Sequence, residues 1–281
     1  MGMMKEVKVK FENKRNRYTV RFECYNTAQE VVQDCNTREI RHSTYDVSDD
    51  DFRENWQGVT SYDEALDLLK NGYQPTVEKL QQALKANKMG TGKRIAFENN
   101  ICGFAPIVPL ALKGIPNSMI NTTIKPIKCK VIDIYYDMGV PASMSSEDII
   151  KCGQKLLGTI IELEKQGYRF NLYALQAFSD DSDADILCVK VKSSDKPIDL
   201  KRMSFPLTHP AFFRVIGFDW QSKNPNTKYR GSGRGKALTH SITDADAKEM
   251  AKQAFGDNAI YLSCNSINRN SEQYIKEVLT K

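Results

Sequence analysis

The sequence lacks the features that mark secreted, zinc-binding or membrane-spanning proteins. Its seven cysteines form no C-x-x-C pair and are odd in number, so free thiols in a reducing cytoplasm are expected. The first ten residues, MGMMKEVKVK, hold no apolar run, and we therefore expect no signal peptide. No stretch approaches the ~20 apolar residues of a membrane span, and no membrane partner is expected.

Complete catalytic motifs are also missing. The three histidines are isolated, and no H-x-x-x-H, H-x-E or G-x-S-x-G pattern occurs. His209 lies beside several phenylalanines and is predicted to be a packed side chain rather than a base. Gly92-Lys93 lacks the upstream glycine of a phosphate-binding loop, and Arg94 stands where Ser or Thr is needed. These absences favour a protein that is not an enzyme.

Length and charge set loose bounds. The 281 residues suffice for one large domain or two smaller ones, and 41% hydrophobic residues suffice for a core. The net charge of +5 is mildly basic, well short of a dedicated nucleic-acid binder.

The stretch from Cys129 to Phe178 organises the chain. Residues 130–137 are rich in Val, Ile and Tyr, which predicts a strand that is buried on both faces. Ser145 and Ser146 are candidate helix N-caps, and apolar residues then recur at helical spacing around Gly153, a small residue that permits close approach. A second strand follows at 168–178. This strand–helix–strand unit predicts an α/β sheet with Asp137 at the end of its first strand, where such sheets place ligand sites.

The flanking segments divide the chain into two regions. Alternation predicts a hairpin at 5–12 and 17–23, and Ser61 with Glu64 forms a capping box at a helix start. Residues 95–126 hold four prolines and two glycines, which predicts an irregular connector packed through Phe97, Phe104, Leu110 and Ile115. We therefore expect a small N-terminal α+β region at 1–126 and an α/β domain at 127–281, in which 186–192 pairs with 168–178 as a hairpin.

This order of elements, with an Asp at the tip of the first strand, resembles a von Willebrand factor A-type domain, a Rossmann-like sheet flanked by helices. That family binds Mg²⁺ through D-x-S-x-S after its first strand and through ligands from two later loops. Here Gly139 and Pro141 replace both serines, so the resemblance implies a degenerate site. It places the remaining metal ligands at Asp137, Ser179, Asp180 and Asp219. No cofactor is expected. The ion that these residues would hold, if they bound a metal, is Mg²⁺.

A second resemblance covers most of the chain. The segments WQGVTSYDEALDLLKNGY (56–73), FENNICGFAPIVPLALKGIPNSM (97–119), the unit at 131–178 and KPIDLKRMSFPLTHPAFFRVIGF (196–218) are similar, in the same order, to an uncharacterised protein family of tailed bacteriophages. The resemblance implies a phage source and no established activity.

The loop 221–236 is the most distinctive basic segment, because it has five Lys or Arg and no acid. Its glycines free the backbone, and Tyr229 can stack on a base. Contact with nucleic acid or another anionic partner is predicted at Lys228, Tyr229, Arg230, Arg234 and Lys236.

The leading expectation is a non-enzymatic, phage-encoded protein–protein interaction module in the host cytoplasm or the virion, with a virion-associated, host-interaction or adaptor role. Two alternatives stay open. One is nucleic-acid binding through the loop 221–236, and the other is a metal-dependent enzyme around Asp137 and Asp219.

Overall fold

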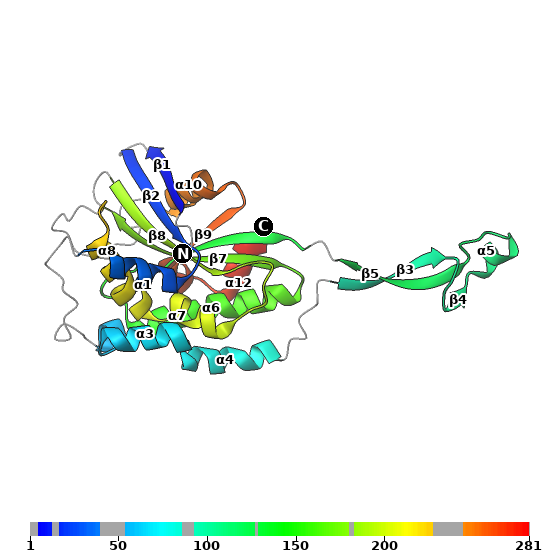
Figure 1. The fold of residues 1–281 in the computed structure, drawn as a ribbon, viewed down its shortest axis with the longest axis horizontal. Helices are drawn as coiled ribbons and strands as arrows, with labels where there is room; N and C mark the ends of the chain where they lie inside the picture. Colours follow the sequence, from blue (N-terminus) through cyan, green and yellow to red (C-terminus); the bar gives the residue numbers. More distant parts are fainter. Residues whose placement is uncertain are drawn as a thin grey trace.

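The protein is built on a six-stranded mixed sheet with the strand order β1-β2-β8-β7-β6-β9 (Figure 1). The computed structural model describes residues 5–12, 17–39, 54–85, 93–126, 129–179, 183–226 and 244–280. The strands of this sheet are β1 (Lys5–Glu12), β2 (Arg17–Tyr25), β6 (Val131–Asp137), β7 (Arg169–Ser179), β8 (Asp183–Lys192) and β9 (Ala259–Ser263).

The strands run in two opposed groups. β6 lies parallel to both β7 and β9, whereas β8 runs antiparallel to β7 and parallel to β2. The predicted strand–helix–strand unit is confirmed, because β6 and β7 are parallel neighbours joined through α6 (Ser146–Lys165). The predicted hairpin between β7 and β8 is confirmed as well. The carboxyl ends of β2 and β8 therefore lie at one edge of the sheet, and those of β6, β7 and β9 at the other.

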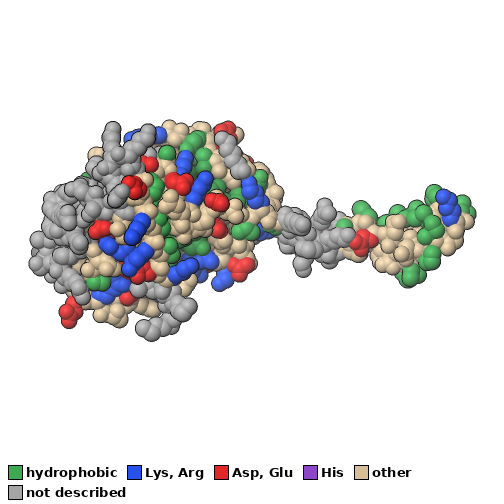
Figure 2. Space-filling model, turned by 90° about the horizontal axis from the view of Figure 1, so that it is seen from above, with side chains coloured by type: hydrophobic (Ala, Val, Ile, Leu, Met, Phe, Trp, Pro, Cys, Tyr) green, Lys and Arg blue, Asp and Glu red, His purple; other side chains and the backbone are tan. Residues whose placement is uncertain are grey.

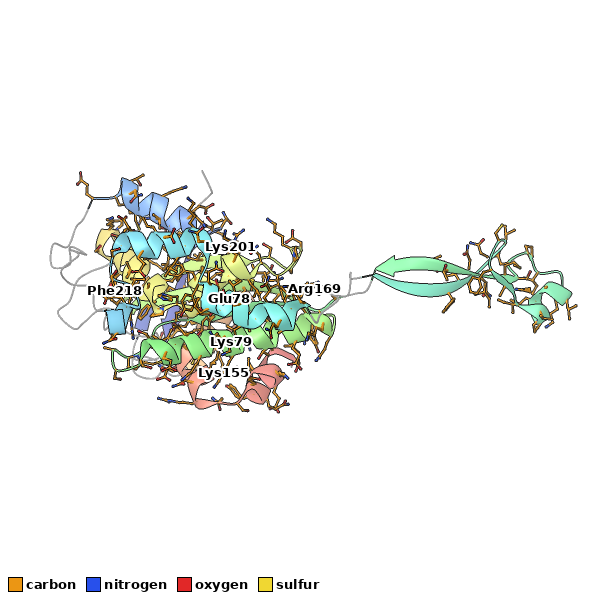
Figure 3. The ribbon with its side chains drawn as sticks, turned by 90° about the horizontal axis from the view of Figure 1, so that it is seen from below. Glu78, Lys79, Lys155, Arg169, Lys201 and Phe218 are labelled. Carbon is orange, nitrogen blue, oxygen red and sulfur yellow. The ribbon has the colours of Figure 1, made fainter. Side chains whose placement is uncertain are left out.

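Helices cover the two faces of the sheet unequally. Most of them form one layer, which Figure 3 shows from below, and its core includes Ile134 and Tyr136 of β6. On the opposite face α10 (Asp244–Phe255) packs over Tyr135 and neighbouring strands, as the alternation of a strand requires. The main layer comprises α1 (Ala28–Thr37), α2 (Glu54–Gln57), α3 (Tyr62–Asn71), α4 (Gln74–Lys85), α6, α7 (Leu200–Thr208), the π-helix Phe212–Gly217, α8 (Phe218–Lys223), α11 (Cys264–Arg269) and α12 (Glu272–Thr280). Among the described helices, none has the length and apolarity needed to cross a bilayer.

Helix α6 is the centre of the main layer. The Ser145 hydroxyl caps it by accepting from the Asp148 N–H at 3.1 Å, as predicted. Its buried face includes Leu156 and Leu157, both without solvent exposure. A Cβ on Gly153 would lie 2.2 Å from the carbonyl oxygen of Leu207, so only glycine lets α7 approach this closely.

The main sheet takes strands from both sides of residue 126. β1 and β2 form the predicted hairpin, and β2 pairs with β8 over seven residues, from Thr19↔Asp183 to Tyr25↔Val189. The N-terminal hairpin is thus continuous with the sheet that holds the strand–helix–strand unit. Residues 13–16, between the two strands of this hairpin, lie outside the described residues.

Residues 93–126, which we call the arm, fold as a separate three-stranded sheet with the order β3-β5-β4. β3 (Lys93–Asn100) pairs along its whole length with β5 (Met119–Pro126). The chain that connects them forms β4 (Ala105–Pro106), which pairs with the other side of β5, and α5 (Val108–Leu112). Figure 1 shows the arm extending away from the main sheet and its helices. An ordered arm thus stands where the prolines predicted an irregular connector, because Pro106, Pro109 and Pro116 lie at its far end and leave the paired stretch of β3 free.

Candidate functional site

The far end of the arm is held together by its own backbone. The Phe104 N–H donates to the carbonyl of Ile120 at 2.9 Å, and the Ile107 N–H donates to that of Ser118 at 2.6 Å. A Cβ on Gly103 would lie 2.0 Å from the Ile120 carbonyl oxygen, so glycine is required where β4 approaches β5. The end of the arm is therefore a defined surface with a fixed backbone.

That surface is apolar and exposed. Figure 2 shows hydrophobic side chains gathered at the far end of the arm. In the described residues, the arm carries every exposed large apolar side chain except Val131, so this surface has no counterpart on the body. The exposed fractions range from 41% to 84% for Phe97, Ile101, Phe104, Val108, Leu112 and Ile115. The prediction that Phe97, Phe104 and Ile115 pack inside a connector is wrong, because the arm has too few layers to bury them.

The apolar surface is also nearly uncharged. Between residues 96 and 123 the only charged residues are Glu98 and Lys113. Nucleic-acid binding depends on several cationic contacts to phosphates, and this part of the arm does not supply them. An apolar, uncharged surface favours a partner that buries it.

Asp137, the first predicted metal ligand, lies at the end of β6 as expected and is fully buried. One carboxylate oxygen accepts from the Gly139 N–H at 2.8 Å, and the other accepts from the Tyr261 hydroxyl at 2.6 Å. Both oxygens thus hold the turn after β6 and the neighbouring strand β9. The arrangement stabilises the edge of the sheet.

Asp219, the ligand predicted from a later segment, lies in α8 and has different partners. Its carboxylate accepts from the Tyr62 hydroxyl at 3.0 Å and pairs with Lys223 at 2.8 Å. Burial, followed by the charge of Asp219, raises the pKa of Tyr62 and keeps its hydroxyl a donor. Lys223 is the last residue of α8 and also belongs to the basic stretch 221–236. Its ammonium is therefore already paired with Asp219.

The remaining predicted site residues are only partly placed. Ser179 ends β7, and its backbone pairs with Ala184 of β8. Asp180 lies outside the described residues, as do Lys228, Tyr229, Arg230, Arg234 and Lys236. Among the residues that the structure describes, no group of three or more His, Cys, Asp or Glu is arranged to hold a metal ion.

Two buried polar groupings have no signal in the sequence. Lys192 of β8 pairs with Glu164 of α6 at 2.7 Å, and both side chains are almost completely buried. Tyr25 donates to Asp34 at 2.6 Å and accepts from the indole N–H of Trp220 at 3.1 Å. Burial and the bond to Asp34 raise the pKa of Tyr25, so it stays neutral. Both groupings join residues far apart in the chain, and no local pattern reveals them.

The fold and the arm define an α/β protein with a projecting apolar arm. A family model described as "Domain of unknown function (DUF7192)" matches residues 6–281, so the chain belongs to this family. No curated protein and no solved structure matches the chain.

Proposed function

We propose that the protein is a non-enzymatic protein–protein interaction module that docks through the far end of its arm into an apolar groove of another protein. The exposed apolar surface of the arm is the observation that carries the proposal. Contiguous apolar patches on soluble proteins commonly mark interaction sites, and aromatic anchors such as Phe97 and Phe104 dominate binding energies.

The order in the arm supports tight docking. β3 and β5 are paired over eight residues, from Lys93↔Pro126 to Asn100↔Met119. Because the backbone is already fixed, binding has to order few degrees of freedom. Each Å² of apolar surface that a partner covers contributes roughly 25 cal/mol, so a groove that takes several of these side chains gains several kcal/mol.

We infer that the arm docks on another protein and not on the body of a second copy of this chain. Val131 is the single large apolar side chain exposed on the described part of the body, which is too little to cover the arm of a second copy. The partner chemistry that fits is an apolar, weakly charged groove on another protein.

The finer identity that we propose is a von Willebrand A-like module of phage origin, acting in the host cytoplasm or the virion. The parallel β6–α6–β7 unit with Asp137 at its tip supports the likeness. The two alternatives remain proposals: nucleic-acid binding through the loop 221–236 and a metal-dependent enzyme around Asp137 and Asp219. Among the described residues, the exposed apolar side chains of the arm give docking the most support.

A pair of matched variants tests the proposal. Phe104→Ser with Leu112→Ser removes two apolar anchors, whereas Asn99→Ser with Asn117→Ser changes two exposed polar residues of the same arm. A partner captured from the cells in which the protein is made is purified and titrated against each protein. We expect the apolar variant to lose affinity about a hundredfold, as loss of two hot-spot side chains does, and the control to bind normally.

Equal binding by the apolar variant and the wild type would overturn the proposal. So would a wild-type dimer in solution that only the apolar variant abolishes, because the arms would then cover each other. Binding of the wild type to lipid vesicles, lost in the apolar variant, would assign the arm to a membrane surface instead.

A further inference from the structure

An open cavity of about 440 Å³ lies at the edge of the sheet opposite Asp137. The parallel strands β2 and β8 both end there, and the helices that follow them, α1 and α7, both begin there. Ligands of α/β sheets bind outside the carboxyl ends of parallel strands, and this volume is in the range of small-molecule sites. The cavity therefore has the position and size of a ligand site.

The charges around the cavity are mainly positive. Its described lining residues include four cationic ones, Lys190, Lys192, Lys196 and Arg202, and one acid, Asp199. The Asp199 carboxylate accepts from the Arg202 backbone N–H at 3.1 Å, where it caps α7. The Lys190 ammonium lies 5.9 Å from the ring centroid of Tyr173, on the face of the sheet that α10 covers, and Lys192 pairs with Glu164. Among the described lining residues, Lys196 and Arg202 are the cations left for a ligand.

Arg202 is held at the wall of the cavity by the chain itself. Its guanidinium donates to the carbonyl of Asn26 at 3.2 Å, between the end of β2 and the start of α1. Because arginine has five N–H donors in a planar fork, one bond of this kind orients the group and leaves it suited to an oxyanion.

Lys196 is positioned by a buried ion pair beneath it. The Lys192 ammonium pairs with Glu164 and donates to the carbonyls of Ser193 at 3.2 Å and Lys196 at 3.1 Å. The turn is closed by the Lys196 N–H, which donates to Ser193 at 3.1 Å. Burying a Lys–Glu pair adds little to stability, so its contribution here is to fix this turn. Lys192 is a positioning residue rather than a ligand contact.

We propose that this cavity binds a small phosphate-bearing molecule through Lys196 and Arg202. Two cations, one from the turn after β8 and one from α7, suit a multiply charged oxyanion, which accepts several charge-assisted hydrogen bonds at once. The amino ends of α1 and α7 add favourable partial charge at the same edge. The site is independent of the arm, so it stands whether or not the arm docks as proposed.

Titration calorimetry on the full chain at low salt tests the site, with pyrophosphate and ATP as probes and citrate at equal ionic strength as the comparison. The variants are Lys196→Gln and Arg202→Gln. Lys201→Gln is the matched control, because Lys201 neighbours Arg202 in α7, is exposed, and does not line the cavity (Figure 3). Lys196→Gln keeps the backbone carbonyl that Lys192 binds, so its fold is preserved.

We expect saturable binding of a phosphate probe, weakened about tenfold by Lys196→Gln and by Arg202→Gln and unchanged in Lys201→Gln. Melting temperatures without ligand should match the wild type for Lys196→Gln. Three results would overturn the proposal: no binding at millimolar probe, equal binding of citrate, or equal weakening by the control. The last two would show that only general charge attraction is measured.

Discussion

The Tyr261 hydroxyl donates a 2.6 Å hydrogen bond to the Asp137 carboxylate and so joins β9 to β6 at the end of the sheet. Both residues are buried. A side chain that the sequence predicted to be a metal ligand is thus engaged by two donors of its own chain, the Tyr261 hydroxyl and the Gly139 N–H. In this arrangement the carboxylate connects neighbouring strands.

Replacing Tyr261 by Phe removes one hydrogen bond to a charged group, which contributes about 1.5–3 kcal/mol. We expect the free energy of unfolding, measured in urea, to fall by that amount. Tyr274→Phe in α12, which is only partly buried, should change it little. An unchanged Tyr261→Phe variant would show that the hydroxyl contributes no net stability.

Millimolar Mg²⁺ should leave the melting temperature unchanged, because both Asp137 oxygens already accept hydrogen bonds and Mg²⁺ demands an octahedral set of oxygen ligands. The measurement is a thermal melt over a Mg²⁺ series. A saturable upward shift that Asp137→Asn abolishes would instead support a metal site at this edge.

Leu157→Asp should prevent soluble folding. Leu157 has no solvent exposure in α6, and an unpaired buried charge costs several kcal/mol. Lys155→Asp introduces the same charge on the outer face of the helix and should give a soluble protein (Figure 3). A soluble Leu157→Asp variant with the wild-type melting temperature would mean that this face of α6 is not buried.

Local patterns predicted the elements that depend on neighbouring residues. The β6–α6–β7 unit follows from apolar periodicity and the Ser145 cap, and the two hairpins of the main sheet follow from alternation across short turns. The pairing of β2 with β8 could not be predicted, because it joins residues more than 150 positions apart and no local signal selects the partner strand. The arm was hidden by its prolines, none of which lies in β3: Pro106 is in the short strand β4, and Pro126 ends β5.

The Lys192–Glu164 pair illustrates what the sequence hides at the cavity. Removing one partner leaves a buried charge without its counterion, so Glu164→Leu should lower the free energy of unfolding by about 3–5 kcal/mol. The double variant Glu164→Leu with Lys192→Met should recover most of that loss, because two apolar side chains of similar volume replace the pair. Urea unfolding of both variants and of Lys192→Met alone measures this, and additive effects would show that the two residues act separately.

His209 makes the free energy of unfolding sensitive to acid. Burial lowers the pKa of His209 to about 4 from its ordinary 6.5, and the ring packs against Tyr73 at 4.6 Å between centroids. Between these two pH values the unfolded chain binds a proton that the folded chain does not, so stability falls as pH drops from 6.5 toward 4. The loss at pH 5 is about 2 kcal/mol.

The variant His209→Asn isolates the contribution of His209 to this pH dependence. Its amide oxygen can still accept the hydrogen bond that the Ala211 N–H donates to His209 Nδ1 at 3.2 Å. Other titrating groups contribute equally to both proteins. We expect the difference in free energy of unfolding between pH 7.5 and pH 5 to be smaller in the variant by about 2 kcal/mol. Identical pH dependence would show that His209 titrates normally in the folded chain.

Replacing the arm, residues 93–126, by a short Gly-Ser linker should leave the stability of the body unchanged. Neither of the two hydrophobic cores contains a residue of the arm. The ends of the arm lie side by side, because Lys93 and Pro126 are register partners, so a few residues bridge them. We expect an unchanged midpoint of urea unfolding, together with weaker binding of a hydrophobic dye because the exposed apolar surface is gone.

The variant Asn99→Ser with Asn117→Ser keeps the arm and should bind dye like the wild type. Loss of cooperative unfolding without the arm would mean that it supports the body. In that case the apolar side chains at its end would need a structural explanation in place of a docking role.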